Sequence, residues 1–154
     1  MSEVQDRNRE VLAALRVRRD RLYEAVLDLE RALSVPAGDH PREWAADVGV
    51  VLVRLQTVLD AHVADTENEG GFFDDVREHA PHLLHAVDRL RAEHGPLVES
   101  TSVLVARVTA TDTDAEVDDV RDAAVELIRR LLRHRHRGAE LVYDAYSVDI
   151  SAAD

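Results

Sequence analysis

Apolar residues recur at steps of three and four along four long stretches of the chain. An α-helix turns by about 100° per residue, so this spacing places the apolar side chains on one face and predicts amphipathic helices. The expected helices cover residues 3–34, 41–69, 81–108 and, after a cap within residues 111–114, the stretch to residue 145. Asp39 is the expected cap of the second helix. Because the connections are short, the helices can bury their apolar faces only against one another, which predicts an all-α, antiparallel up-down-up-down four-helix bundle.

The length and composition fit one domain that spans residues 1–154. The chain has 154 residues, of which 45% are hydrophobic and 32% are charged, and this is too little sequence for two well-packed cores. Residues 147–154 follow the last expected core position, and we expect this tail to fray. Apolar runs are only a few residues long, far below the roughly 20 residues of a membrane helix, and no segment resembles a signal peptide. The sequence therefore predicts a cytoplasmic protein without a membrane partner.

Charge and cysteine content narrow the chemistry. The chain carries 31 acidic and 19 basic residues, for a net charge of −12. This balance opposes a nucleic-acid partner, because phosphate binding depends on basic surface. The chain has no cysteine, so any metal site has to use His, Asp or Glu.

Helical phase separates the eight histidines into two groups. Three of them, His62, His94 and His134, continue the apolar faces of the second, third and fourth expected helices. Five lie in a loop or off the inner faces, and we expect them to contact solvent: His40, His79, His82, His85 and His136.

One exposed histidine has the spacing of a metal-binding pair. His136 and Glu140 are four residues apart, and such a pair on a helix can share one ion. If the last helix is unbroken, however, both side chains point to its outer face. A break or bulge at Gly138 would turn Glu140 inward, which keeps it as a secondary candidate.

The three inward histidines predict a metal site. A single buried imidazole is more often a hydrogen-bonded core residue than a ligand, but three of them on separate helices are expected to converge in one half of the bundle. Imidazole nitrogens with a carboxylate suit iron or zinc. The expected ligands are therefore His62, Glu67, His94 and His134, with Glu67 turning in from the end of its helix. Glu69 is the other carboxylate within reach.

Over residues 11–145 the sequence resembles the hemerythrin-like, or HHE cation-binding, family. The resemblance lies in Leu55-x3-Leu59-x2-His62 with Glu67, in Glu93-His94-x2-Leu97, and in Leu127-x3-Leu131-x2-His134. It implies a four-helix bundle that holds non-haem iron for oxygen binding, for oxygen or nitric-oxide sensing, or for peroxide chemistry. Mononuclear iron, dinuclear iron and no cofactor at all remain open.

The sequence also departs from the family pattern, which predicts a reduced or degenerate site. The first expected helix has no histidine, and Arg19 stands at the position of the family's ligand. The family's His-x3-Glu pairs become His62-x3-Thr66 and His134-x3-Gly138. Burying a guanidinium without a partner is costly, so one hypothesis places Arg19 in the position of the missing iron, paired with Glu67 or another carboxylate. The alternative is that its long side chain reaches the surface.

Three functions remain open on this basis. The first is a metal centre whose free coordination positions bind oxygen or nitric oxide. The second is a metal-free interaction or regulatory module, in which clustered arginines on the first and fourth helices and acidic residues after the second favour self-association or an acidic partner. In that setting Tyr143 and Tyr146 either form a dimer contact or cover the end of the bundle. The third is a metal-free enzyme, for which we find no catalytic motif.

Overall fold

The computed structural model describes residues 2–152 of the chain, and it describes side chains as far as Tyr146. Over these residues the structure is helical and contains no strand. The elements are α1 (Glu3–Ser34), α2 (Pro41–Glu67), α3 (Phe72–His79), the short 3₁₀ helix η1 (Pro81–Leu83), α4 (Leu84–Thr109) and α5 (Asp114–Ala152). The expectation of an all-helical protein with four long helices is therefore confirmed.

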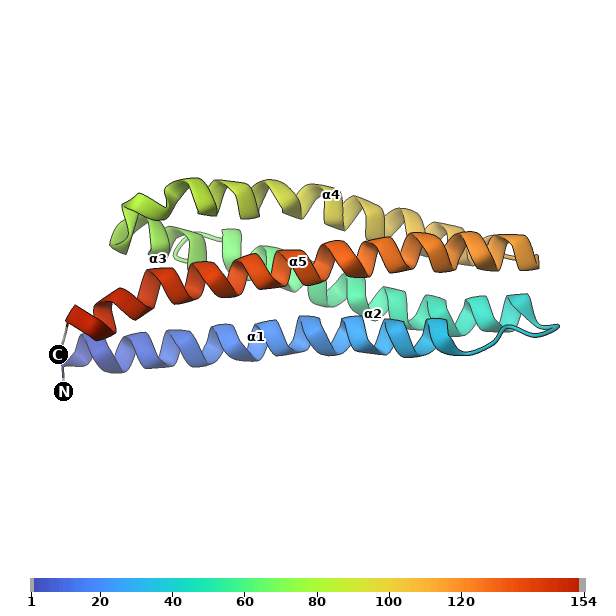
Figure 1. Cartoon of the computed structure of the whole chain (residues 1–154), viewed down its shortest axis with the longest axis horizontal. Helices are drawn as coiled ribbons and strands as arrows, with labels where there is room; N and C mark the ends of the chain where they lie inside the picture. The colour runs from blue at the N-terminus through green and yellow to red at the C-terminus, as the bar shows by residue number, and fades with distance from the viewer. Residues whose placement is uncertain (1, 153–154) are drawn as a thin grey trace.

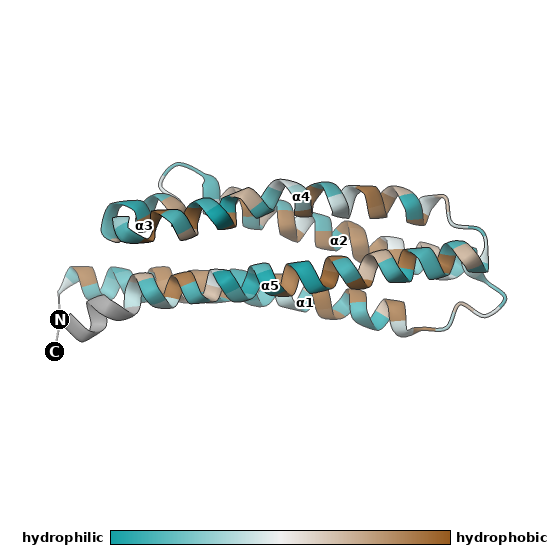
Figure 2. Cartoon of the chain, turned by 45° about the horizontal axis from the view of Figure 1, so that its top comes forward, coloured by the Kyte–Doolittle hydropathy of each residue, from teal (hydrophilic) through white to brown (hydrophobic). Residues whose placement is uncertain are grey.

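The four long helices pack around a common interior. Helix α1 contacts α2 and α5, and α4 contacts the same two helices from the other side. Figure 1 shows the long helices lying side by side along the longest axis, with the start of α1 and the end of α5 at the same end as α3. In Figure 2 hydrophobic and hydrophilic segments follow one another along α1, α4 and α5, as expected of helices with one apolar face. Among the described residues, no helix is both long and apolar enough to cross a membrane.

The buried side chains form two hydrophobic clusters. The larger cluster includes Leu22, Leu59, Leu97 and Leu131, together with the rest of the bundle away from α3. The second, which we call the α3 cluster, contains Leu15, Phe72, Phe73, Val76, Ala80, Val87, Leu90, Leu141, Val142, Ala145 and Tyr146. Along α1, α4 and α5 the chain passes from one cluster to the other across a polar residue, which is Arg19, His94 or His134. On α2, His62 follows the last residue of the larger cluster, Leu59, and the chain enters the α3 cluster at Phe72. The four polar positions therefore lie between two apolar regions.

The helix ends agree with the sequence predictions in part. Thr113 caps α5, because its Oγ1 accepts a hydrogen bond from the Glu116 N–H at 3.2 Å and donates one to the Glu116 carboxylate at 2.9 Å. The predicted cap Asp39 is wrong, since α2 begins directly after His40. Helix α5 continues as far as Ala152, past the start of the tail that we expected to fray at residues 147–154, of which residues 153 and 154 lie outside the described residues.

Two positions on the third expected apolar face differ from the prediction. Leu84, which we placed on the inner face, is 43% exposed at the first residue of α4. Leu104, which the predicted face omits, is buried in the larger cluster. The remaining inner positions of α4 are buried or half-buried, so the phase of this helix is correct through the site.

A tight turn places α3 beside the bundle interior. Gly70 has a φ of +74°, a conformation that favours glycine. At Gly71 an added Cβ would meet the backbone oxygens of Asp65 and Asn68 at 2.7 and 2.8 Å. The turn therefore brings the chain back against the end of α2, and α3 presents Phe72 and Phe73 to the interior.

Candidate metal centre

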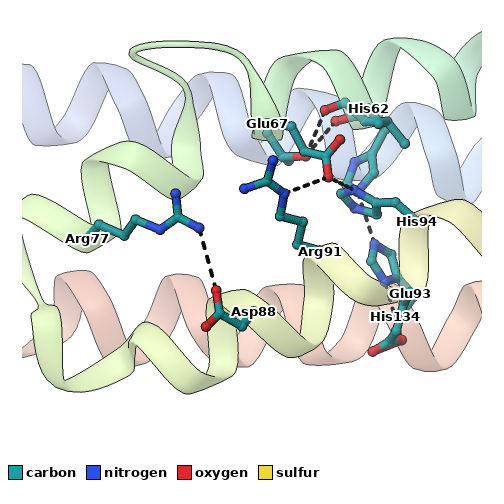
Figure 3. A network of polar contacts seen from close by, with 10 residues as sticks. His62, Glu67, Arg77, Asp88, Arg91, Glu93, His94 and His134 are labelled. Atoms are coloured by element: carbon teal, nitrogen blue, oxygen red, sulfur yellow. Dashed lines mark hydrogen bonds and ion pairs between the residues drawn. The ribbon is translucent and has the colours of Figure 1, made fainter.

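The three inward histidines meet inside the bundle, as the sequence predicted. Nε2 of His62 on α2 lies 3.2 Å from Nε2 of His134 on α5. The ring of His94 on α4 has its centroid 5.4 Å from that of His62 and 4.9 Å from that of His134. One ligand atom from each ring can be chosen so that all three lie within 4.8 Å of one another. Figure 3 shows the three rings converging from separate helices.

Burial keeps these imidazoles neutral. His94 and His134 are each 2% exposed, and His62 is half-buried. Burial, followed by the neighbouring His134 and His94, lowers the pKa of His62 from 6.5 to about 3. Burial and then His94 lower the pKa of His134 to about 4, against the opposing effect of Glu93. Burial also lowers the pKa of His94, against Glu67. At neutral pH the rings therefore carry the unprotonated nitrogens that a metal requires.

Each fully buried ring has a carboxylate beside its Nδ1. Glu67 Oε1 lies 3.4 Å from Nδ1 of His94, and Glu93 Oε2 lies 3.5 Å from Nδ1 of His134. These separations are slightly longer than a hydrogen bond. Both Nδ1 atoms lack a hydrogen-bond partner among the residues described, and so does Nε2 of His94. A carboxylate on this side favours the tautomer with a proton on Nδ1, which leaves Nε2 free to bind an ion.

An arginine holds each carboxylate in turn. Arg137 Nη1 donates to Glu93 at 2.8 Å, and Arg91 Nε lies 3.4 Å from Glu67 (Figure 3). Both arginines keep much of their side chain in solvent, at 42% and 53% exposure. The two carboxylates therefore connect an exposed cation to a buried imidazole.

The structure places Glu67 next to the histidine cluster, and within the described part of the chain the group of possible ligands contains only the three histidines. The prediction that Glu67 itself binds the metal stays a prediction. Glu93 has the equivalent position beside His134, although the sequence analysis did not select it as a site residue. The signal in the sequence was that Glu93 directly precedes the inward residue His94. One residue on a helix corresponds to a rotation of about 100°, which directs Glu93 toward the neighbouring helix.

Arg19 lies at the edge of the site and forms no ion pair among the described residues. The predicted pair with Glu67 is wrong, because that carboxylate contacts His94 and Arg91. The alternative, in which the side chain reaches the surface, is met only in part, because the side chain is half-buried and its Nε is buried with no hydrogen-bond partner in the described part of the chain. Burial, with the nearby cations Arg135 and Arg16, lowers the pKa of Arg19.

A small cavity adjoins the cluster on the side of Arg19. Its volume is about 40 Å³, and its polar lining comes from Arg18, Arg19, His62, Thr66, His134 and Arg135. Its apolar lining includes Phe72 and Phe73 from α3. The Thr66 hydroxyl is engaged with the backbone oxygens of His62 and Val63. The ring of Phe73 also stacks on His94, with centroids 5.7 Å apart and planes 17° apart. Helix α3 therefore closes one side of both the cavity and the histidine cluster.

The remaining histidines lie away from the cluster. His136 and Glu140 form an ion pair at 3.2 Å with side chains 76% and 63% exposed, and α5 runs unbroken through Gly138. The outward orientation expected for this pair is confirmed. The expectation of surface positions is also confirmed for the others: His40, His79, His82 and His85. Of the two tyrosines considered above as a dimer contact or as a cover for the end of the bundle, Tyr143 is 70% exposed. Tyr146 is buried in the α3 cluster, and its hydroxyl donates a hydrogen bond to the Asp75 carboxylate.

Comparisons of this chain with protein-family models, with curated proteins and with solved structures found no match.

Proposed function

We propose that the protein binds one transition-metal ion, with iron favoured, through His62, His94 and His134, in an antiparallel, hemerythrin-like helical bundle. The open coordination positions of the ion then bind a small diatomic molecule, oxygen or nitric oxide. The observation that carries the proposal is the convergence of three neutral imidazoles from three helices.

The spacing of the nitrogens supports this assignment. Two nitrogens bound to one ion at about 2.1 Å lie roughly 3.0 to 3.4 Å apart for coordination angles between octahedral and tetrahedral. Nε2 of His62 and Nε2 of His134 are 3.2 Å apart. Nε2 of His94 is buried, no described residue forms a hydrogen bond with it, and an ion would satisfy it. The His62–His134 pair therefore has the spacing of two ligands on one ion, and His94, whose ligand atom lies within 4.8 Å of theirs, would complete the set.

The surroundings support one ion and oppose a second. No carboxylate joins the three histidines as a further ligand in the cluster found among the described residues. The guanidinium of Arg19 borders the cavity beside His62 and His134, where its positive charge repels a second cation. We infer a reduced, mononuclear centre in place of a di-iron centre.

The protein's own residues prepare the site in three ways. Glu67 and Glu93 stand beside Nδ1 of two ligands and orient their Nε2 atoms inward. Phe73 covers one face of His94, and the two hydrophobic clusters exclude water from the interior. Bound iron with free coordination positions supplies affinity for oxygen or nitric oxide.

Metal content measures the proposal directly. Full-length protein produced with iron, purified without chelators and analysed for metals is expected to contain about one ion per chain. His62→Gln is expected to lose most of this metal, whereas the control His136→Gln retains it, because His136 is exposed and outside the cluster. Nitric oxide added to the iron(II)-loaded protein is expected to change its visible absorption.

Two results would contradict the proposal. One is a folded wild-type protein that remains metal-free after iron and zinc are supplied, which would favour the metal-free interaction module. The other is equal metal content in wild type and His62→Gln. Stoichiometric zinc with no iron would confirm the site and contradict the binding of a diatomic molecule.

A further inference from the structure

We propose that the cavity beside the histidine cluster binds a small monoanion of two or three non-hydrogen atoms, such as nitrite or formate, through the guanidinium of Arg19. The proposal goes beyond the metal centre, because the binding group is an arginine on α1 and the site exists without an ion.

The unpartnered donor of Arg19 is the first observation. Its Nε is buried and has no hydrogen-bond partner among the described residues. Leaving a charged donor buried and unsatisfied costs more than leaving a neutral one. The two neighbouring arginines on the cavity wall are engaged elsewhere. Arg18 pairs with Asp65 at 3.1 Å, and the guanidinium of Arg135 lies 4.6 Å from the centroid of the Tyr23 ring. Arg19 is therefore the cation on this wall that is available to a ligand.

The charge of the cavity wall is the second observation. Of the residues that the structure describes, three arginines and two histidines line the cavity, and no carboxylate does. Six apolar side chains on the wall lower its polarity, so the attraction between Arg19 and an anion is stronger here than at a fully exposed surface. These side chains are Leu15, Leu22, Phe72, Phe73, Leu90 and Val142. A wall of this composition favours a negative charge over a neutral or positive ligand.

The size of the cavity limits the ligand. A volume of about 40 Å³ corresponds to about three water-sized occupants. Bent triatomic monoanions fill this space and offer two oxygen atoms to a guanidinium. Acetate adds a methyl group, and sulfate has five non-hydrogen atoms. The geometry therefore predicts selection by size within the class of small anions.

The test uses the full-length chain in its chelator-treated form, so that its outcome is independent of metal binding. The Nε–H resonance of Arg19 is assigned by its absence in Arg19→Met and followed by NMR while sodium nitrite replaces sodium chloride at constant ionic strength. We expect a saturating shift with millimolar affinity, a similar response to formate, at least a tenfold weaker response to acetate, and none to sulfate.

Two variants complete the test. Arg19→Met keeps much of the side-chain length, removes the guanidinium, and is expected to abolish the change in thermal midpoint that nitrite causes in wild type. Arg16→Met removes an exposed arginine one turn earlier on α1 and is expected to respond like wild type. No saturation by nitrite, an unchanged response in Arg19→Met, or equal effects of sulfate and nitrite would each overturn the proposal. Because no metal is present, none of these outcomes bears on metal binding by the histidines.

Discussion

Acidification is expected to destabilise the metal-free protein through its buried histidines. His62 and His134 have pKa values of about 3 and about 4 in the folded protein, against about 6.5 in an unfolded chain. The unfolded state therefore binds more protons between these limits, and the free energy of unfolding falls as the pH falls from about 6.5. Between pH 7 and pH 4.5, His62 and His134 are each expected to lower the free energy of unfolding by roughly 2 to 3 kcal/mol, or by roughly 5 kcal/mol together.

Urea denaturation of chelator-treated protein at pH 7 and pH 4.5 measures this loss. Protonation of carboxylates also changes stability over this range, so the informative quantity is a comparison between variants. His62→Gln removes one of the three buried histidines whose pKa is lowered, and the stability that this variant loses on acidification is expected to be smaller than that of wild type by roughly 2 to 3 kcal/mol. His136→Gln removes an exposed histidine and is expected to behave like wild type. Equal pH dependence in wild type and His62→Gln would refute the reasoning.

Three further predictions concern the supports of the site. Glu93→Gln is expected to weaken metal affinity by about 10- to 100-fold, measured by competition with a chelator, whereas the exposed Glu140→Gln is expected to leave it unchanged; equal affinities would contradict the role of Glu93. Phe73→Ala removes a buried ring that stacks on His94 and is expected to cost about 3 to 5 kcal/mol in urea denaturation. Gly71→Ala brings a Cβ within 2.7 Å of a backbone oxygen and should lower the thermal midpoint, while Gly49→Ala, in a helix with open space, should raise it by a few degrees; the opposite order would contradict the structure.

Much of the fold followed from sequence periodicity, because a helix that buries one face fixes the phase of its residues. This phase identified His62, His94 and His134 as inward, and it placed His136 and Glu140 outside. It did not resolve helix ends, where single residues such as Leu84 escape the apolar pattern.

The contacts of charged side chains were harder to predict. One of the two hypotheses for Arg19 gave it a carboxylate partner such as Glu67, but Glu67 contacts Arg91 and His94. Glu93 was missed because its role comes from the neighbouring helix, where Arg137 and His134 meet its carboxylate. Long side chains choose among several partners across helices, and spacing along one helix does not identify which partner is reached.

The polar level between the two hydrophobic clusters has a consequence for how the molecule opens. At this level each long helix has a polar residue in place of an apolar one on its inner face, namely Arg19, His62, His94 or His134. The residues of the α3 cluster can therefore unfold locally while the larger cluster stays folded. Backbone amides beside Leu141, in the α3 cluster, are expected to exchange with deuterium faster than those beside Leu127, in the larger cluster. An ion bound by the histidines between the two clusters would make these exchange rates more similar, because it would couple the unfolding of one cluster to that of the other.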